Sequence, residues 1–181
     1  SSDTGEGTVN TASLVFTAGN WNTPQTVTVS GVNDDIDDGD QAYNIVLAAA
    51  TSSDSNYNGV NPDDVAVTNT DNDAATLSIN DISITELDAG SATTTFTITS
   101  SVESVNTITV DYASSNDTAT ASSDYTATSG TATITAGNTT QTLTITHLGD
   151  VIDEANETFN ITLSNATNAT ISDNTGVATI N

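Results

Sequence analysis

The sequence predicts an all-β protein built from tandem antiparallel β-sandwich domains of the immunoglobulin-like kind. Three observations predict this fold class. Short runs rich in Val, Ile and Thr alternate apolar with polar residues, the pattern of strands with one buried face. Turn-forming residues separate these runs at short intervals, which is typical of sandwiches. The same succession of strands and turns occurs twice along the chain, which indicates a tandem arrangement.

The composition excludes several classes of function. The 181 residues include 24 acidic side chains and no Lys or Arg, so the formal net charge is −24. Proteins bind nucleic-acid phosphates and anionic membrane surfaces through Lys and Arg, so we expect no nucleic-acid partner. No apolar run is long enough to cross a bilayer, so we expect no membrane insertion. The chain has no Cys, which removes disulfides and thiolate chemistry.

The apolar runs place the strands and the domain boundary. In the first half, residues 1–10 are expected to form a polar loop, strands are expected near 12–17, 25–31, 42–49 and 64–69, and a turn-rich loop at 51–63. In the second half, strands are expected near 75–79, 82–86, 92–100, 106–113, 129–135, 140–147, 157–164 and 175–180. We place one domain at residues 1–73 and the other at residues 74–181.

Overlaying the two halves reveals an internal repeat. Residues 25–29 match 141–145, and at the same offset of 116 the pairs Asp34 and Asp150, Ile36 and Ile152, Asp37 and Asp153, Asp38 and Glu154, and Tyr43 and Phe159 coincide. Upstream the offset is 118, which places Glu6 on Asp124. The second copy has about three strands, within residues 75–113, that the first copy lacks. We therefore expect a piece of a longer array, whose first sandwich is incomplete at its N-terminal side and is completed by strands from a neighbouring copy or chain.

Acidic residues gather in the turn that follows each matching strand. The first such turn, residues 33–40, holds five carboxylates, and the second occupies residues 149–157. Carboxylates this close repel one another unless a cation lies among them, and the chain supplies no Lys or Arg. Hard oxygen ligands are those that Ca²⁺ prefers, which favours a calcium site over a merely solvated loop. The turn lacks the Gly and Glu positions of an EF-hand loop, and strands flank it.

Four elements of the second half occur in the order found in a known family. They are Ile-Thr-Glu at 84–86, Ser-Asp-Tyr at 123–125 before the strand at 130–134, Ala-Gly-Asn at 136–138, and the acidic run at 150–159. With these elements, residues 75–181 resemble the Calx-β domain, the calcium-binding sandwich of sodium–calcium exchangers and of large bacterial surface proteins. The first half, through residues 37–43 and 69–73, is similar to the later part of a related repeat of bacterial extracellular proteins. The resemblance implies a location outside the cell or on the surface of a bacterium.

The resemblance also implies calcium ions clustered at one end of each sandwich. In the second copy it implies the ligands Glu86, Asp124, Asp150, Glu154, Glu157 and the backbone carbonyl of Ile152. In the first copy it implies the ligands Glu6, Asp34, Asp35, Asp38, Asp71 and Asp73. The family's first and third turn acids fall on Gly149 and Val151, and Gln41 stands where Glu157 stands in the other copy. Both sites are therefore expected to be incomplete within this chain.

These observations favour a calcium-stiffened structural module of an extracellular repeat protein, forming a rod or filament for surface attachment or matrix. An alternative is a recognition module of a surface adhesin that binds a glycan or a receptor through Trp21 and the 51–63 loop. A lone Trp beside a strand more often covers the end of a small core, and we predict that role for Trp21. A third interpretation, an intracellular calcium sensor, is opposed by the absence of any basic residue.

We expect no enzyme. The single histidine, His147, shares a strand face with Leu143 and Ile145, which predicts a half-buried structural role. The carboxylates crowd together as in a metal site instead of flanking a substrate, as glycoside hydrolysis would require. Tyr43 and Phe159 occupy matching positions of the two copies and are expected in the cores.

Overall fold

The structure is a computed structural model that describes residues 1–152 and 154–181. It divides into two compact units, which are considered one at a time. The first unit comprises residues 1–34 and 38–72, and the second comprises residues 35–37 and 73–181. The regular elements of the described residues are all β-strands, and none of these residues belongs to a helix with the length and hydropathy of a membrane span. Asp153, which the overlay matches to Asp37, lies outside the described residues.

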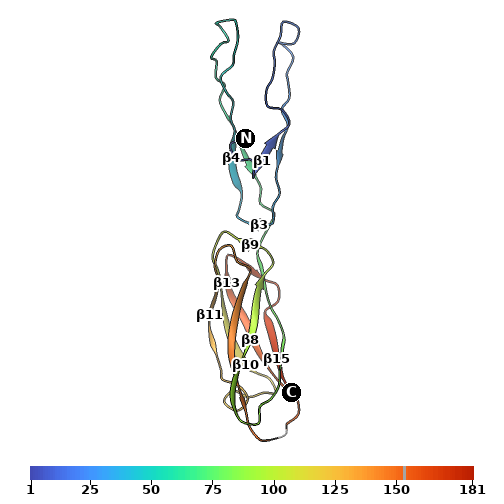
Figure 1. The fold of residues 1–181 in the computed structure, drawn as a ribbon, viewed down its shortest axis with the longest axis vertical. Helices are drawn as coiled ribbons and strands as arrows, with labels where there is room; N and C mark the ends of the chain where they lie inside the picture. Colours follow the sequence, from blue (N-terminus) through green and yellow to red (C-terminus); the bar gives the residue numbers. More distant parts are fainter. Residues whose placement is uncertain (153) are drawn as a thin grey trace. The chain divides into compact units, whose positions relative to one another are not determined.

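The second unit is a sandwich of two sheets (Figure 1). One sheet has the strand order β12-β8-β6-β14 and the other the order β11-β10-β13-β15-β7. The strands are β6 (Thr76–Ile79), β7 (Ile82–Ile84), β8 (Gly90–Ser100), β10 (Ile108–Asn116), β11 (Ser129–Ile134), β12 (Thr140–Gly149), β13 (Glu157–Thr167), β14 (Thr170–Ile171) and β15 (Thr175–Ile180). Neighbouring strands are antiparallel, except that β7 runs parallel to β15 and β14 runs parallel to β6. The predicted sandwich is confirmed.

A short parallel pair completes the second unit. Strand β3 (Ile36–Asp37) pairs with β9 (Glu103–Ser104). The carbonyl oxygen of Asp37 accepts hydrogen bonds from the Ser104 hydroxyl at 3.2 Å and from the Val105 amide at 3.2 Å. Its carboxylate accepts one from the amide of Ala75 at 3.2 Å, next to the start of β6. Three residues of the first acidic turn are thereby held within the second unit.

Alternating side chains of both sheets form the core of the second unit. Phe159 on β13 is fully buried, stacks on Tyr125 at a centroid separation of 4.1 Å and meets Phe96 edge-on at 6.3 Å. His147 is buried on the same side as Leu143 and Ile145 of β12. The alternation of Thr with apolar residues, read from the sequence, thus corresponds to one buried and one exposed face. The expected core position of Phe159 and the inward direction of His147 are confirmed, but the prediction of a half-buried His147 is wrong, because the residue is 6% exposed.

The first unit has two short hairpin-like pairs. Strand β1 (Gly7–Val9) pairs with β2 (Val29–Gly31), and β4 (Gln41–Ile45) pairs with β5 (Val65–Asn69). Tyr43 is buried, as predicted, because it packs on Gly7. A Cβ atom at Gly7 would lie 1.9 Å from the Tyr43 hydroxyl oxygen, so only glycine fits there.

Equivalent hydrogen bonds confirm the internal repeat. The pair Gly7–Gly31 of the first unit corresponds to the isolated bridge between Tyr125 and His147 of the second. The amide of Val32 donates to the carbonyl of Glu6 at 3.0 Å, and the amide of Leu148 donates to the carbonyl of Asp124 at 2.9 Å. Glu6 therefore occupies the backbone position of Asp124, as the offset of 118 predicts.

Several predicted strands of the first unit are wrong. Residues 12–17 form no strand. In the predicted strand at 25–31 only residues 29–31 are paired, and in the region of the predicted strand at 42–49 only residues 41–45 are paired. The expected loop at 1–10 contains β1. Strands need ladder partners. The counterpart of 12–17 in the second unit belongs largely to β11, which pairs with β10, and the first unit has no counterpart of β10. The estimate of about three extra strands is also low, because β6, β7, β8, β9 and β10 all precede the matching part.

The prediction of a core role for Trp21 is wrong for the same reason. Its side chain is 70% exposed, since the strands that would carry a core around it are missing from the first unit. The loop predicted at 51–63 is confirmed as a segment of turns with no strand.

Candidate metal centre

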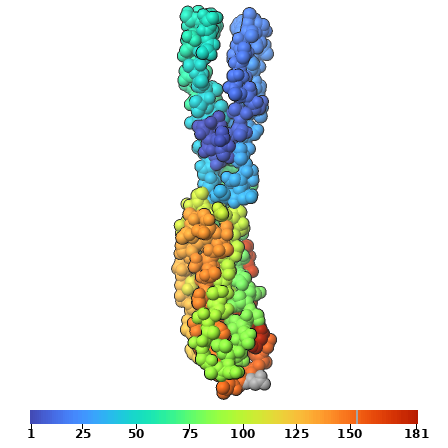
Figure 2. All heavy atoms as spheres, viewed as in Figure 1, coloured from blue at the N-terminus to red at the C-terminus, as the bar shows by residue number. Residues whose placement is uncertain are grey.

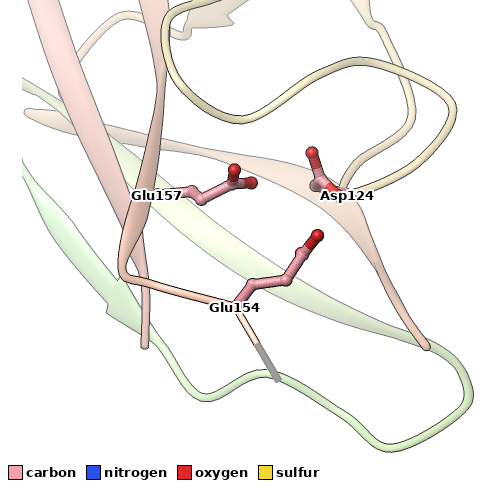
Figure 3. A group of neighbouring side chains, drawn as sticks. All are labelled: Asp124, Glu154 and Glu157. Atoms are coloured by element: carbon pink, nitrogen blue, oxygen red, sulfur yellow. The ribbon is translucent and has the colours of Figure 1, made fainter. Parts of the chain in front are cut away.

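Three carboxylates converge at one end of the second unit. Asp124, Glu154 and Glu157 each offer one oxygen within 4.8 Å of the others (Figure 3). Asp124 comes from the loop between β10 and β11, Glu154 from the segment that precedes β13, and Glu157 is the first residue of β13. The three side chains point toward a common space, although they lie on segments about 30 residues apart in sequence.

The position of Asp124 is fixed by its own backbone and by its neighbour. Its Oδ2 accepts a hydrogen bond from the amide of Thr120 at 2.6 Å, which closes the loop into a turn. Its carbonyl oxygen accepts one from the amide of Leu148 at 2.9 Å, which joins the loop to β12. The next residue, Tyr125, is buried against Phe159. The core therefore fixes the position of Asp124 within the acidic group.

The acids of this end repel one another. Loss of hydration is the largest cause that raises the pKa of Glu157, followed by the negative charge of Asp124 and a carboxyl–carboxyl hydrogen bond with it, and then by Glu154 and Glu86. The pKa of Glu154 is likewise raised by loss of hydration and then by Asp150, Asp124 and Glu86. Because Glu154 is exposed, water still reaches its carboxylate. The repulsion between the acids is the cause that a bound cation would relieve.

The raised pKa values predict how the metal-free chain responds to pH. The folded state binds protons at Glu154 and Glu157 more tightly than the unfolded state, so its stability falls as the pH rises through the folded pKa values. We therefore expect the free energy of unfolding to increase as the pH is lowered from 7 toward 4.5, the ordinary pKa of Glu.

Urea unfolding in excess chelator at pH 7, 6 and 5 measures this dependence. A chain carrying Glu154→Gln and Glu157→Gln should show a flatter profile over the same interval. A wild-type stability that stays constant or falls on acidification in this range would contradict the prediction.

The other predicted ligands of the second copy surround this group. Glu86, two residues past β7, and Asp150, one residue past β12, lie close enough to repel Glu154. Asp150 Oδ1 accepts a hydrogen bond from the amide of Ile152 at 2.6 Å, and the Ile152 side chain is exposed. The structure thus brings three of the six predicted residues into one close group and places Glu86 and Asp150 beside it.

Packing explains one departure from the family's acidic pattern. A Cβ atom at Gly149 would lie 2.0 Å from the carbonyl oxygen of Leu87, so no side chain fits where the resemblance expects an acid. The backbone of the turn approaches the segment after β7 closely instead.

The predicted ligands of the first copy are divided between the two units. Glu6, Asp34, Asp38 and Asp71 belong to the first unit, whereas Asp35 and Asp73 belong to the second. Asp71 Oδ2 accepts hydrogen bonds from the amides of Asp38 at 3.1 Å and Gly39 at 2.7 Å. Among the described residues these acids do not form a group as close as the one at Asp124, Glu154 and Glu157.

Two amide side chains occupy this part of the first unit. Gln41, at the position of Glu157, donates from Nε2 to the carbonyl of Asp38 at 2.9 Å. Asn69 donates from Nδ2 to Glu6 Oε2 at 3.1 Å and to the carbonyl of Val32 at 2.7 Å. Asn69 was not among the residues predicted from the sequence. The sequence carries no signal for it, because its position opposite Gln41 follows from the β4–β5 register.

The fold and this acidic end define a β-sandwich module with carboxylates arranged for a divalent cation. The sequence pattern of the Calx-beta domain matches the chain twice, at residues 8–81 and 69–181. The chain belongs to the Calx-beta domain family, which confirms the resemblance. A search of curated proteins gave no match.

Solved structures of Calx domains share the fold. The apo-form Calx CBD1 domain is similar with a TM-score of 0.55 and 17% identity, covering 60% of this chain and 96% of that one. The Calx CBD2 domain gives a TM-score of 0.50 and 14% identity, covering 58% of this chain and 85% of that one. A calcium binding domain, CBD12 of CALX1.1, gives a TM-score of 0.53 at 17% identity, covering 58% of this chain and 44% of that one.

Proposed function

We propose that the chain is a calcium-stabilised structural module of an extracellular bacterial repeat protein. The observation that carries this proposal is the convergence of Asp124, Glu154 and Glu157 in a chain with no Lys or Arg to neutralise them. Membership of the Calx-beta family supports it, and one similar structure is described as a calcium binding domain.

The proposed mechanism is electrostatic. Asp124, Glu154 and Glu157, with Glu86 and Asp150 nearby, would hold a Ca²⁺ ion, whose charge would offset the mutual repulsion of these carboxylates. Shared binding by Asp124 and Glu157 would also tie the Asp124 loop to the start of β13. Because the ion binds the folded unit and not the unfolded chain, its binding free energy adds to the stability of the fold. Outside the cell, dissociation constants of about 10⁻⁴–10⁻³ M suffice.

In an array, such modules would form a rod or filament for surface attachment or matrix. Two repeats follow one another in this chain, and the acidic turn at 33–40 and the residues at 71–74 lie where the two units meet in sequence. Neutralising these turns is the step that would stiffen the array. Neighbouring copies of the repeat are the proposed partners.

Spin labels test the stiffening directly. The chain has no native Cys, so the double variant Thr68→Cys with Thr142→Cys places one label on an exposed strand position of each unit. Calcium should narrow the distance distribution between the labels relative to excess chelator, and equal magnesium should not. A distribution of the same width in both conditions would overturn the proposal of a calcium-stiffened rod.

A second candidate is a recognition module for glycans or a surface receptor. The observation that favours it is the exposure of Trp21 (70%) and of Tyr57 (64%), which lies in the 51–63 loop. Aromatic faces open to solvent can stack on sugar rings.

Trp21→Ala separates the two candidates. We expect it to change the stability of the chain by less than about 0.5 kcal/mol, since the side chain is exposed. A glycan array and the fluorescence of this single tryptophan provide the readouts. Saccharide binding by the wild type that Trp21→Ala abolishes would support recognition. A loss of stability of several kcal/mol would contradict the expectation for Trp21.

A further inference from the structure

Apolar side chains of the first unit are open to solvent where their counterparts in the second unit are buried. Phe16 is 58% exposed, whereas its counterpart Ile134 is 2% exposed. Leu47 is 36% exposed, whereas its counterpart Leu163 is 2% exposed. These residues belong to two arms, residues 10–28 and 46–64, which stand apart with open space between them (Figure 2). Both arms lack the strand pairing of their counterparts.

The second unit shows what covers these positions. Its β10 lies between β11 and β13 and buries Ile108 and Val110, and its β8 lies beside β12 and buries Phe96 and Ile98. The first unit contains segments that match β11, β12, β13 and β15 in sequence or pairing, but none of its described strands corresponds to β6, β7, β8, β9 or β10. Its open face therefore comprises the positions that β8 and β10 cover in the second unit.

We propose that this open face is an acceptor for a second copy of segment 74–118. The inserted copy would place its β10 counterpart between residues 11–16 and 43–51, and its β8 counterpart beside residues 24–31. Backbone hydrogen bonds on both arms and burial of apolar side chains would hold it, which is β-strand addition. The proposal rests on the proposed function only in naming neighbouring copies of the repeat as partners.

The donor has to be a copy of the segment that is not already part of a closed sandwich, which excludes residues 74–118 of this chain and of any other folded copy of it. Those residues already form β6 to β10 of the second unit, where β8 pairs with β12 and β6, and β10 pairs with β11 and β13. Transferring them would open the second unit as much as it closed the first. The exchange would leave the total number of closed sandwiches unchanged.

The internal repeat also fixes the register of insertion. In the second unit Ile108 pairs with Ile134, and Tyr112 pairs with Leu163. By the offsets of 118 and 116, the donor residue matching Ile108 pairs with Phe16, and the one matching Tyr112 pairs with Leu47. Thr118 directly precedes the position that aligns with Ser1, so a copy of 74–118 fused ahead of Ser1 reproduces the spacing found in the second unit.

Hydrogen exchange of the full chain, with and without this fused copy, tests the proposal. In the fused protein, amide exchange at 11–16 and 46–51 should slow by at least about 100-fold, the scale that separates an unpaired segment from a folded strand. The matched control carries Ile108→Asp and Val110→Asp in the added copy alone and should show no such protection. Exchange of the arms that the wild-type copy does not slow more than this control would overturn the proposal.

A further variant, Phe16→Ala, distinguishes insertion from misfolding of the fused protein. Phe16→Ala should leave the thermal midpoint of the unmodified chain unchanged and lower the first unfolding step of the fused protein by roughly 10 °C, because insertion buries Phe16. Equal effects in both backgrounds would contradict insertion.

Two further readouts separate this proposal from its alternatives. Light scattering on the unmodified chain detects symmetric pairing of the arms. A dimer with protected arms would show that a second first unit, and not segment 74–118, covers the face. Amide exchange of the arms in the fused protein, measured in calcium and in chelator, distinguishes the insertion proposal from the calcium proposal. Loss of calcium binding changes the acidic end of the second unit and leaves the arms protected.

Discussion

Phe159→Ala is expected to destabilise the second unit by about 3–5 kcal/mol, the usual cost of removing a fully buried phenylalanine. Phe159 is fully buried, stacks on Tyr125 at 4.1 Å and meets the edge of Phe96 at 6.3 Å. The substitution removes both ring contacts and leaves a cavity between the two sheets. It also loosens Tyr125, the buried residue next to Asp124, so calcium affinity should fall as well.

Chemical unfolding at fixed calcium concentration measures this cost. Phe16→Ala is the matched control, because Phe16 also belongs to a strand-like sequence but is 58% exposed, and its cost should stay below about 0.5 kcal/mol. Similar losses for the two substitutions would mean that the core is not centred on Phe159.

Joint replacement of Glu154 and Glu157 by Gln is expected to remove the stabilisation by calcium and to stabilise the metal-free chain. Glutamine keeps the size of each side chain and removes two of the three converging charges. Without metal, the repulsion that raises the pKa of both groups disappears, so the chelated variant should unfold at a higher temperature than the chelated wild type. Addition of calcium should raise the unfolding temperature of the variant only slightly.

Glu103→Gln provides the control for this pair, because Glu103 is an exposed acid on β9 of the same unit, outside the close group of three. It should leave the calcium increment intact. A double variant whose unfolding temperature rises with calcium as much as that of the wild type would show that the ion binds elsewhere. A double variant that is less stable than the wild type in chelator would show that repulsion between these acids does not limit the stability of the metal-free fold.

Most of the second unit could be predicted from its sequence because its strands are local patterns with partners. Alternation along 140–147 and 157–164 gave strands whose inward side chains are buried, and the repeat offset placed Glu6 on the backbone position of Asp124. Short pairings such as β3 with β9 escaped prediction, because two residues carry no periodic pattern.

The first unit was predicted less well because strand formation is a property of pairs. Residues 12–17 have the composition of a strand, yet the structure gives them no ladder partner, and Trp21 is exposed for the same reason. The acidic positions could be read from the sequence, but the hydrogen bonds of Asn69 and Gln41 could not. They depend on which residues the β4–β5 register sets opposite each other.

Thermal unfolding in millimolar calcium and in excess chelator, at matched ionic strength, tests the central claim that calcium bound at Asp124, Glu154 and Glu157 stabilises the fold. With calcium at about 100 times its dissociation constant, one site adds about 2.7 kcal/mol, which corresponds to a midpoint higher by roughly 10 °C. The account predicts a rise of this size with calcium and not with equal magnesium. A midpoint that chelation leaves unchanged would contradict it and would mean that these carboxylates are only solvated.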